Sequence, residues 1–254
     1  MIEVHELTAV FPNGNGGLQA LDKISFDVLA QEFLCILGPS GSGKSTLLRI
    51  LAGLLPPTEG EVLYLGEHVS GPRIDVGFVF QKSNLMPWRT VLENITLPLE
   101  LELPRNHGLD RSSMVPKALE MIELVGLSGF EDSLPRDLSG GMAQRVAIAR
   151  ALIHDPSVLL LDEPFGALDA MTRVRMGSEL LRIWQARRKT VVMVTHSISE
   201  AVFLADRVLV LTNRPGQLCL DLKIDLARPR QEGVRYTPKF GALARQVRLA
   251  IGEA

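Results

Sequence analysis

Gly38-Pro39-Ser40-Gly41-Ser42-Gly43-Lys44-Ser45-Thr46 matches the phosphate-loop pattern of a glycine, four free positions and then Gly-Lys-Ser/Thr. The apolar run at residues 33–37 leads into this motif and predicts a buried strand. The apolar, periodic residues 45–55 follow it and predict a helix. Strand, glycine-rich loop and helix are the context that the motif requires, so we expect an α/β fold with an anion-binding loop after one strand.

The residue types of this loop suit the phosphates of a nucleotide. Gly38, Gly41 and Gly43 permit backbone turns that a Cβ atom would forbid, and they let N–H groups approach an anion. Lys44 can reach the β- and γ-phosphates, and the Ser45 hydroxyl can ligate Mg²⁺. The alternative is a glycine-rich turn that binds nothing, but the flanking strand and helix favour a nucleotide site.

The composition bounds the class of protein. The chain has 254 residues, enough for one large domain or two small ones, and its net charge of −2 gives no sign of a nucleic-acid-binding surface. Cys35 and Cys219 are its two cysteines, which predicts no disulfide framework and a reducing compartment. Residues 1–10 do not resemble a signal peptide, and no run approaches the roughly 20 apolar residues that span a bilayer. A role at a membrane is therefore expected to depend on a partner protein.

The apolar pattern predicts an α/β core interrupted by a helical insert. Strands are expected at residues 2–10, 21–29, 33–37, 61–65, 76–80, 158–161, 191–195 and 207–212. Helices are expected at residues 45–55, 92–103, 113–125, 141–153, 171–187, 198–204 and 240–251. Pro98 argues against a regular first helix in the insert, residues 11–17 and 104–110 are expected to be loops, and the pattern is broken beyond residue 216. We expect one domain, residues 1–254, with a core at about 1–87 and 156–215, a helical insert at about 88–155 and a C-terminal extension at about 216–254.

Asp162 and Glu163 come directly after the apolar run at residues 158–161. Because the carboxyl ends of parallel strands meet at one edge of a sheet, we expect this pair near the phosphate loop. One carboxylate can hold Mg²⁺, directly or through water, and the other can accept a proton from an attacking water. The alternative is two surface acids that cap the next turn, and the phosphate loop favours the catalytic interpretation.

The sequence Leu138-Ser139-Gly140-Gly141 precedes the helix expected at residues 141–153. Ser139 is a good N-cap, and the glycines expose backbone N–H groups toward an anion. Taken alone, an ordinary helix cap is the better interpretation. The residues themselves do not explain why the chain would need a second anion-binding helix start.

Taken together, the phosphate loop, the Leu-Ser-Gly-Gly sequence, the strand ending in Asp162-Glu163 and the later strand followed by His196 resemble the ATP-binding-cassette (ABC) ATPases over essentially the whole chain. The resemblance implies the ABC ATPase fold: a P-loop NTPase with an α/β, RecA-like core, an inserted α-helical subdomain and a small antiparallel β region. It also implies a head-to-tail homodimer. Each ATP would then lie between the phosphate loop of one subunit and the Leu-Ser-Gly-Gly helix of the other, which would explain the second anion site.

The resemblance also assigns catalytic roles. Glu163 resembles the general base, Asp162 the Walker B metal residue, and His196 the switch histidine that contacts the γ-phosphate. Gln81 resembles the glutamine that senses Mg²⁺ and the attacking water, so the implied metal residues are Ser45, Gln81 and Asp162. Residues 165–169, Phe-Gly-Ala-Leu-Asp, resemble the loop that communicates across the dimer.

The implied ATP site is larger than the phosphate loop. Phe11 resembles the aromatic residue that stacks on adenine, with a core phenylalanine as the alternative. The implied ATP-binding residues are Phe11, Gly38, Pro39, Ser40, Gly41, Ser42, Gly43, Lys44, Ser45, Thr46, Ser139, Gly140 and Gly141. Met142 stands where many family members have glutamine, but the serine and glycines before it are kept, so activity is expected to survive.

Leu85, Met86 and Trp88 cluster in a stretch rich in turn-forming residues. Exposed apolar side chains of this kind suit a groove for a partner helix, and packing of the insert onto the core is the alternative. The sequence Leu85-Met-Pro-Trp-Arg-Thr-Val-Leu-Glu-Asn94 resembles the nitrate, sulfonate and taurine importer branch of the family. In importers of this family, the matching region receives a cytoplasmic helix of the membrane permease.

The resemblance therefore implies an ATP-hydrolysing subunit of an importer that energises uptake of a small solute through a permease. Its expected partners are a second ATPase subunit, the permease and an extracytoplasmic solute-binding protein, with no nucleic acid. Its expected location is the cytoplasmic face of the cell (inner) membrane, as a peripheral protein. One alternative is a non-transport ABC ATPase that acts on ribosomes or DNA, and another is a small-molecule P-loop kinase. The transported solute stays open among nitrate, sulfonate, taurine and a pyrimidine-like vitamin precursor.

Overall fold

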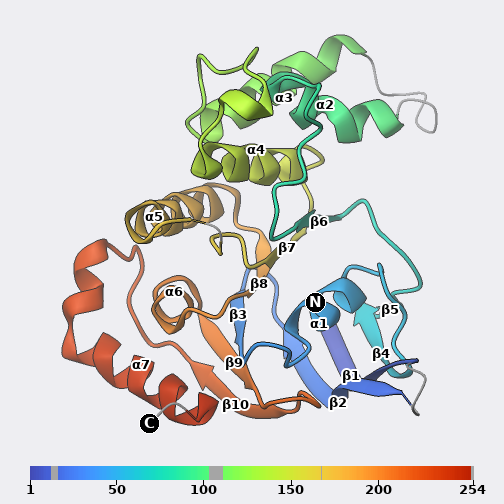
Figure 1. Cartoon of the computed structure of the whole chain (residues 1–254), viewed down its shortest axis with the longest axis vertical. Coiled ribbons are helices and arrows are strands. Elements are labelled where there is room, and N and C mark those ends of the chain that lie inside the picture. The colour runs from blue at the N-terminus through green and yellow to red at the C-terminus, as the bar shows by residue number, and fades with distance from the viewer. Residues whose placement is uncertain (13–16, 103–110, 167, 253–254) are drawn as a thin grey trace. The chain divides into compact units, whose positions relative to one another are not determined.

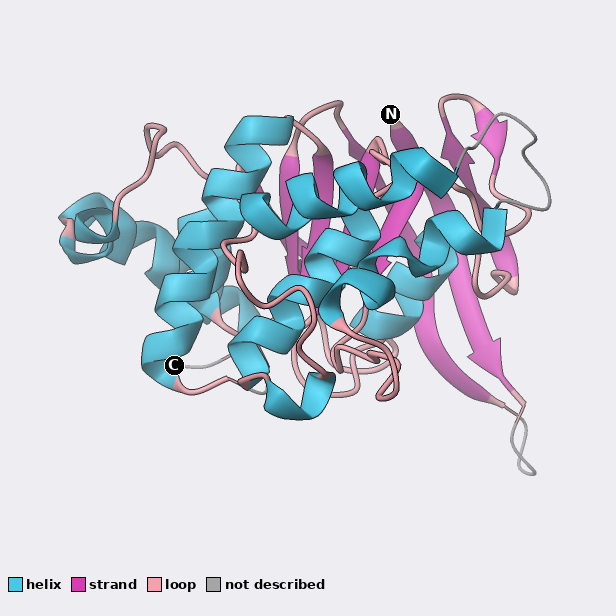
Figure 2. Cartoon of the chain, turned by 90° about the horizontal axis from the view of Figure 1, so that it is seen from above, coloured by secondary structure: helices cyan, strands magenta, loops and turns pink. Residues whose placement is uncertain are grey.

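The computed structural model describes residues 1–254 except 13–16, 103–110, 167 and 253–254 (Figure 1). The described chain forms two compact units. Unit 1 contains residues 1–73, 160–163 and 189–254, and unit 2 contains residues 74–159 and 164–188. Both units contain helices and strands, which Figure 2 distinguishes by colour.

Unit 1 begins with a four-stranded antiparallel sheet in the order β2-β1-β4-β5. Its strands are β1 (Ile2–Phe11), β2 (Leu18–Val28), β4 (Glu59–Tyr64) and β5 (Glu67–His68). Ile24, Phe26 and Val28 are buried on one face while the residues between them are exposed, as the alternation in the sequence predicts. This sheet is the small antiparallel β region that the family resemblance implies.

The central sheet of unit 1 holds the strands that precede the site. Its order is β10-β9-β3-β8, followed by the C-terminal residues of β7. The strands are β3 (Phe33–Leu37), β7 (Val158–Asp162), β8 (Thr190–Val194), β9 (Arg207–Leu211) and β10 (Leu218–Lys223). β3 pairs in parallel with β8 and β9, while β10 is antiparallel to β9. All five residues of β3 and of β8 are buried, as expected for parallel strands covered on both faces.

Three helices of unit 1 pack on this sheet: α1 (Lys44–Leu51) on β8, α6 (Ile198–Leu204) on β3, and α7 (Pro238–Ile251) on β9 and β10 (Figure 1). The segment between β10 and α7 includes a short 3-10 turn at Glu232–Tyr236, which contacts α6 and α7. These helices supply the apolar cover that keeps the strands buried.

Unit 2 is mostly helical. It contains β6 (Val76–Val79) beside the first residues of β7, and the helices α2 (Val91–Glu102), α3 (Arg111–Leu124), α4 (Gly140–Leu152) and α5 (Ala170–Arg187). The helices α2, α3 and α4 pack against one another around Ile95, Ala118 and Ile148, which are fully buried. A 3-10 turn at Pro135–Asp137 precedes α4. Among the described residues, no helix is long and apolar enough to cross a membrane.

Several expectations about the elements were wrong. The first helix ends at Leu51 rather than near residue 55, because Gly53 adopts a φ of +69° that reverses the chain. Pro98 lies inside the regular helix α2, whose packing through Ile95 and Leu99 offsets the lost hydrogen bond. β10 was not expected, since an edge strand with alternate half-buried positions gives a weak apolar signal. Of the loop expected at residues 11–17, Phe11 belongs to β1 and residues 13–16 lie outside the described residues, as does the loop expected at residues 104–110.

Candidate nucleotide-binding and catalytic site

The phosphate loop connects β3 to α1, as the sequence predicts. Gly41 and Gly43 adopt φ angles of +81° and +88°, a region that favours glycine. A Cβ atom on Gly43 would lie 2.6 Å from Leu21 Cδ2 and 2.7 Å from the Ala20 carbonyl oxygen, whereas a Cβ on Gly41 would meet nothing within 4 Å. The loop conformation thus requires glycine at position 43 for both backbone and space.

Lys44 lies at the first position of α1, and its side chain turns back along the loop. The ammonium donates hydrogen bonds to the carbonyl oxygens of Gly38 at 2.8 Å and Pro39 at 2.7 Å, and to Ser42 Oγ at 3.3 Å. Burial lowers the pKa of the Lys44 ammonium, while the charges of Glu163 and Asp162 oppose that change. A partly desolvated cation on a loop of backbone amides is suited to hold an anionic phosphate.

Ser45 and Asp162, two of the predicted metal residues, meet although 117 positions separate them. Ser45 Oγ donates a hydrogen bond of 2.7 Å to Asp162 Oδ1. Asp162 is only 4% exposed, and this burial raises the pKa of its carboxyl, while the Ser45 hydrogen bond and the charges of Arg49 and Lys44 lower it. A hydroxyl and a carboxylate in contact are hard oxygen donors of the kind that Mg²⁺ prefers.

Glu163 and His196 also lie together. Glu163 follows β7 with a positive φ of 44°, and its backbone N–H donates to the Val194 carbonyl at 3.0 Å. Its Oε2 lies 3.3 Å from Nδ1 of His196, which follows β8. The Glu163 side chain is 20% exposed and that of His196 is 51% exposed, so both can reach a bound substrate. The strand order β8-β7 accounts for this proximity, because both residues lie just beyond the carboxyl ends of neighbouring strands.

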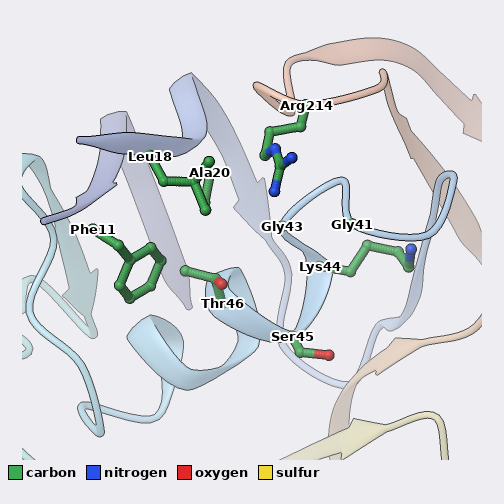
Figure 3. Close-up of a pocket in the computed structure, with 9 residues that line it drawn as sticks. All are labelled: Phe11, Leu18, Ala20, Gly41, Gly43, Lys44, Ser45, Thr46 and Arg214. Atoms are coloured by element: carbon green, nitrogen blue, oxygen red, sulfur yellow. The ribbon is translucent and has the colours of Figure 1, made fainter. Parts of the chain in front are cut away.

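A cavity of about 240 Å³ lies beside the phosphate loop (Figure 3). Its lining residues come from β1, β2, the phosphate loop with α1, and the loop after β9: Phe11, Leu18, Ala20, Gly41, Gly43, Lys44, Ser45, Thr46 and Arg214. Phe11 is 37% exposed rather than part of the core, so its ring is accessible from this cavity. An aromatic ring beside a phosphate-binding loop is suited to stack on a base.

Arg214 was not predicted as a site residue. The figure shows its guanidinium pointing toward Gly43 (Figure 3). Its loop is attached to β2, because the Gly216 N–H donates to the Ala20 carbonyl at 2.9 Å and the Asp22 N–H donates to the Gly216 carbonyl at 3.0 Å. No local sequence signal marks this contact, since it depends on pairing between segments nearly 200 residues apart.

The other predicted site residues belong to unit 2. Ser139 is the N-cap of α4, and its Oγ accepts a hydrogen bond of 3.3 Å from the Met142 N–H. A Cβ on Gly141 would lie 3.0 Å from Thr172 Cγ2, so close packing of α5 is one reason for glycine there. Gln81 follows β6 and is exposed. Ala167, in the predicted communication loop, lies outside the described residues.

These features define a P-loop nucleotide-binding protein. The comparison with known families shows to which family of such proteins the chain belongs. The profile of the ABC transporter family matches residues 21–166, more than half of the chain. The chain belongs to the ABC transporter family and is an ATP-binding, ATP-hydrolysing component of it. This excludes the small-molecule kinase considered above.

Curated relatives match nearly the whole chain. An uncharacterized ABC transporter ATP-binding protein of Methanocaldococcus jannaschii is 54% identical over 229 residues, which cover 90% of this chain and 84% of that protein. The nitrate import ATP-binding protein NrtD of Synechocystis sp. is 45% identical, covering 94% and 86%. The aliphatic sulfonates import ATP-binding protein SsuB of Bacillus thuringiensis is 44% identical, covering 91% and 89%.

Solved structures confirm the predicted fold. The dimeric ABC transporter cassette MJ0796 is 36% identical, with a TM-score of 0.78 over 89% of this chain and 100% of that chain. A post-hydrolysis dimer of the same cassette, bound to ADP and Pi, is 35% identical with a TM-score of 0.76 over the same shares. The family resemblance and the fold class expected from the sequence are therefore correct.

Proposed function

We propose that this chain is the ATPase subunit of an importer that drives uptake of a small anionic solute, such as a nitrate or sulfonate, through a permease. The observation that supports catalysis most directly is the meeting of the phosphate loop, Asp162, Glu163 and His196 within unit 1. The relatives named above as importers of sulfonates and nitrate support the direction of transport and the class of solute. They give no support to a ribosome- or DNA-acting ATPase.

The arrangement supports a division of labour in ATP hydrolysis. The phosphate loop from Gly38 to Thr46 would hold the phosphates through backbone N–H groups and Lys44. Glu163 would accept the proton of the attacking water, and His196 would contact the γ-phosphate. Their separation of 3.3 Å allows both to reach the same phosphate.

Ser45 and Asp162 fit Mg²⁺, because their oxygen atoms are in contact and Asp162 is buried beside the loop. Among the described residues, no group of three or more His, Cys, Asp or Glu side chains could hold a metal ion. A site shared with the nucleotide's phosphates is how Mg²⁺ is usually bound in P-loop proteins. When bound, Mg²⁺ would neutralise charge that develops on the phosphates. Gln81 is predicted to sense this ion and the attacking water.

We infer that two copies of the chain act as a dimer. Ser139, Gly140 and Gly141 would bind the γ-phosphate of ATP held by the partner's phosphate loop. Apart from the Met142 N–H, which donates to Ser139, the first N–H groups of α4 have no acceptor within the helix, and together with the helix dipole they are suited to an anion. The dimeric cassettes that share this fold support the assembly. Binding of ATP would close the dimer, and hydrolysis would reopen it.

The loop at residues 83–90 supports permease docking near Leu85, Met86 and Trp88. Asn94, which is fully buried, accepts a hydrogen bond from the Met86 N–H at 2.8 Å and donates to the carbonyls of Met86, Arg89 and Thr90. Arg150 donates to the Ser83 and Asn84 carbonyls. These bonds fix the loop while Trp88 stays 73% exposed. A rigid loop with an exposed tryptophan is suited to bind a helix of a partner.

The proposed location, peripheral on the cytoplasmic face of the cell membrane, follows from permease docking. A solute-binding protein on the other side of the membrane would deliver the anion. Both statements rest on the family resemblance and on the importer role proposed here, and neither is a property of this chain alone.

Purification of the tagged full chain from its native membranes in mild detergent tests the proposal. A polytopic permease should copurify with the unaltered chain and with Tyr236→Ala, a control that removes an aromatic side chain 88% exposed in unit 1. Trp88→Ala should lower permease recovery about tenfold or more. Recovery with ribosomes or nucleic-acid proteins alone would overturn the transport role. Full recovery with Trp88→Ala would overturn only the docking site.

A further inference from the structure

Helix α6 begins two residues after His196, and its first turn is tied to the end of β8. Ser197 is the N-cap, and its Oγ accepts a hydrogen bond of 3.3 Å from the Glu200 N–H. Thr195 Oγ1 donates to Glu200 Oε2 at 2.6 Å and accepts from the Ser197 N–H at 3.1 Å. His196 therefore lies between two residues that are hydrogen-bonded to Glu200 in the first turn of α6.

The other end of α6 is held by arginines from the segment after β10. Arg230 Nη1 donates to the carbonyls of Val202 at 3.3 Å, Phe203 at 2.9 Å and Ala205 at 2.7 Å. Arg228 Nη2 donates to the intervening Leu204 carbonyl at 2.7 Å. The last four carbonyls of a helix lack helical partners, and here two guanidinium groups take up all four. We call Arg228 and Arg230 the α6 clamp.

The clamp is costly to bury, which argues against an incidental contact. Arg230 is only 7% exposed, and its other nitrogens donate to the carbonyls of Ile224 and Leu226. Burial, and then the charge of Arg228, lower the pKa of Arg230 to about 10, so the group still carries its charge at neutral pH. The five donors of a guanidinium can satisfy several carbonyls at once, which an ammonium cannot do with the same geometry.

The helix itself explains the need for a clamp. With seven residues, α6 is too short to be stable alone, since isolated helices below about 12–15 residues are marginal in water. Arg235 adds a third contact: its Nη1 donates to Ser199 Oγ at 2.6 Å, and its guanidinium lies 3.9 Å from the Phe203 ring centroid. Contacts at both ends make α6 a short rigid link between the C-terminal extension and the loop that carries His196.

We propose that Arg230, assisted by Arg228, is a positioning residue for the ATPase reaction: it holds α6 so that His196 stays beside Glu163. The proposal rests on the role given above to His196 at the γ-phosphate. It assigns a function to the C-terminal extension, residues 216–254, which would support catalysis from within unit 1 without touching the nucleotide.

A double-mutant cycle on the full chain, together with its copurifying membrane partners, tests this role. The variants are Arg230→Lys and Arg228→Lys, each alone and combined with His196→Ala, and ATP turnover is measured at a temperature where melting curves show every variant to be folded. Lys239→Met is the control, because Lys239 belongs to the same extension but pairs with Asp225 rather than with α6. The kcat and the KM for ATP are determined separately.

Arg230→Lys should lower kcat about tenfold, leave KM for ATP within about twofold, and have less than about a twofold effect on kcat when His196 is already alanine. Arg228→Lys should lower kcat by a smaller factor, with the same dependence on His196. If Arg230→Lys does not fold, Arg228→Lys serves as the test variant in its place. An equal fall in kcat in both backgrounds would mean that the arginines act through general stability, and would overturn the proposal. If His196→Ala alone leaves kcat unchanged, the role of His196 is wrong and the proposal falls with it. An unchanged kcat in both arginine variants, with His196→Ala impaired, would refute the positioning role alone.

Discussion

Asn94→Ala should destabilise unit 2 and disorder the loop that exposes Trp88. The Asn94 side chain is fully buried and makes four hydrogen bonds to the backbone of residues 86–90, at 2.8, 3.2, 2.9 and 2.9 Å. A hydrogen bond contributes a net of about 0.5–1.5 kcal/mol. Because the two hydrogens of Nδ2 are shared among three carbonyls, we count about three full bonds, which give about 1.5–4.5 kcal/mol. Because the loop is only partly buried, water can replace some of these bonds, and we expect about 2–4 kcal/mol.

This loss is large enough to measure. For a chain of this size, 1 kcal/mol corresponds to a shift of about 2–4 °C in melting temperature, so Asn94→Ala should lower Tm by about 5–15 °C. Ser83→Ala is the matched control, because it keeps the carbonyl that Arg150 binds, and its effect should stay within about 0.5 kcal/mol. Calorimetry or near-UV circular dichroism measures both variants.

Asn94→Asp separates hydrogen bonding from packing. The carboxylate keeps an acceptor for the Met86 N–H, but it cannot donate to the three carbonyls that Asn94 Nδ2 contacts. At neutral pH this variant should be at least as unstable as Asn94→Ala, although it has nearly the original shape. A milder effect of Asn94→Asp than of Asn94→Ala would refute the conclusion that the donated bonds hold this loop.

Three further predictions concern the catalytic site. Glu163→Gln should lower kcat by about 10²–10⁴-fold, the usual contribution of a general base, and leave ATP affinity nearly unchanged. An ATP-bound dimer should then be detectable by size-exclusion chromatography. Normal turnover would rule out Glu163 as the base. Asp162→Asn should abolish turnover yet raise the Tm of the nucleotide-free chain at pH 7. Burial raises the pKa of the Asp162 carboxyl in the folded chain. The stability that the protonated carboxyl contributes is therefore lost as the pH rises from about 4 through that raised pKa, and asparagine, which does not ionise, avoids this loss. A lower Tm at pH 7 for the asparagine variant would contradict this reasoning. Gly43→Ala should weaken ATP binding more than Gly41→Ala in equilibrium titrations. Both glycines have a positive φ, but only position 43 lacks space for a Cβ atom. Equal effects of the two substitutions would show that the close contact with Leu21 and Ala20 is unimportant.

Much of the site could be predicted because its signals are local. The phosphate loop is one continuous run in which strand, glycines and helix follow each other, and each part has its own sequence preference. Asp162 and Glu163 could be placed at a strand end for the same reason. The continuous apolar runs of β3, β7 and β8 predict strands buried on both faces, and all three are fully buried.

Other features of the structure are not predicted by any local pattern in the sequence. The predictions missed β10, whose alternation is weak at a sheet edge, and Arg214, whose loop reaches the cavity through its bonds to β2. Pro98 was expected to make the helix at residues 92–103 less regular, yet the packing of α2 tolerates it. The α6 clamp was also missed, because arginines in a polar, broken stretch look like surface residues until the fold places them against the end of a helix.

The sequence alone determined which residues could do the chemistry: a phosphate loop, a carboxylate pair at a strand end and a histidine after a later strand. The sequence also predicted that Asp162 and Glu163 lie near the phosphate loop, but only the tertiary structure decided which side chains make contact. Ser45 contacts Asp162, and Glu163 lies beside His196, because the strand order brings the carboxyl ends of β3, β8 and β7 to one edge of the sheet. Strand order depends on pairing between segments far apart in the chain, and that pairing is selected by burial of the whole sheet rather than by any one segment.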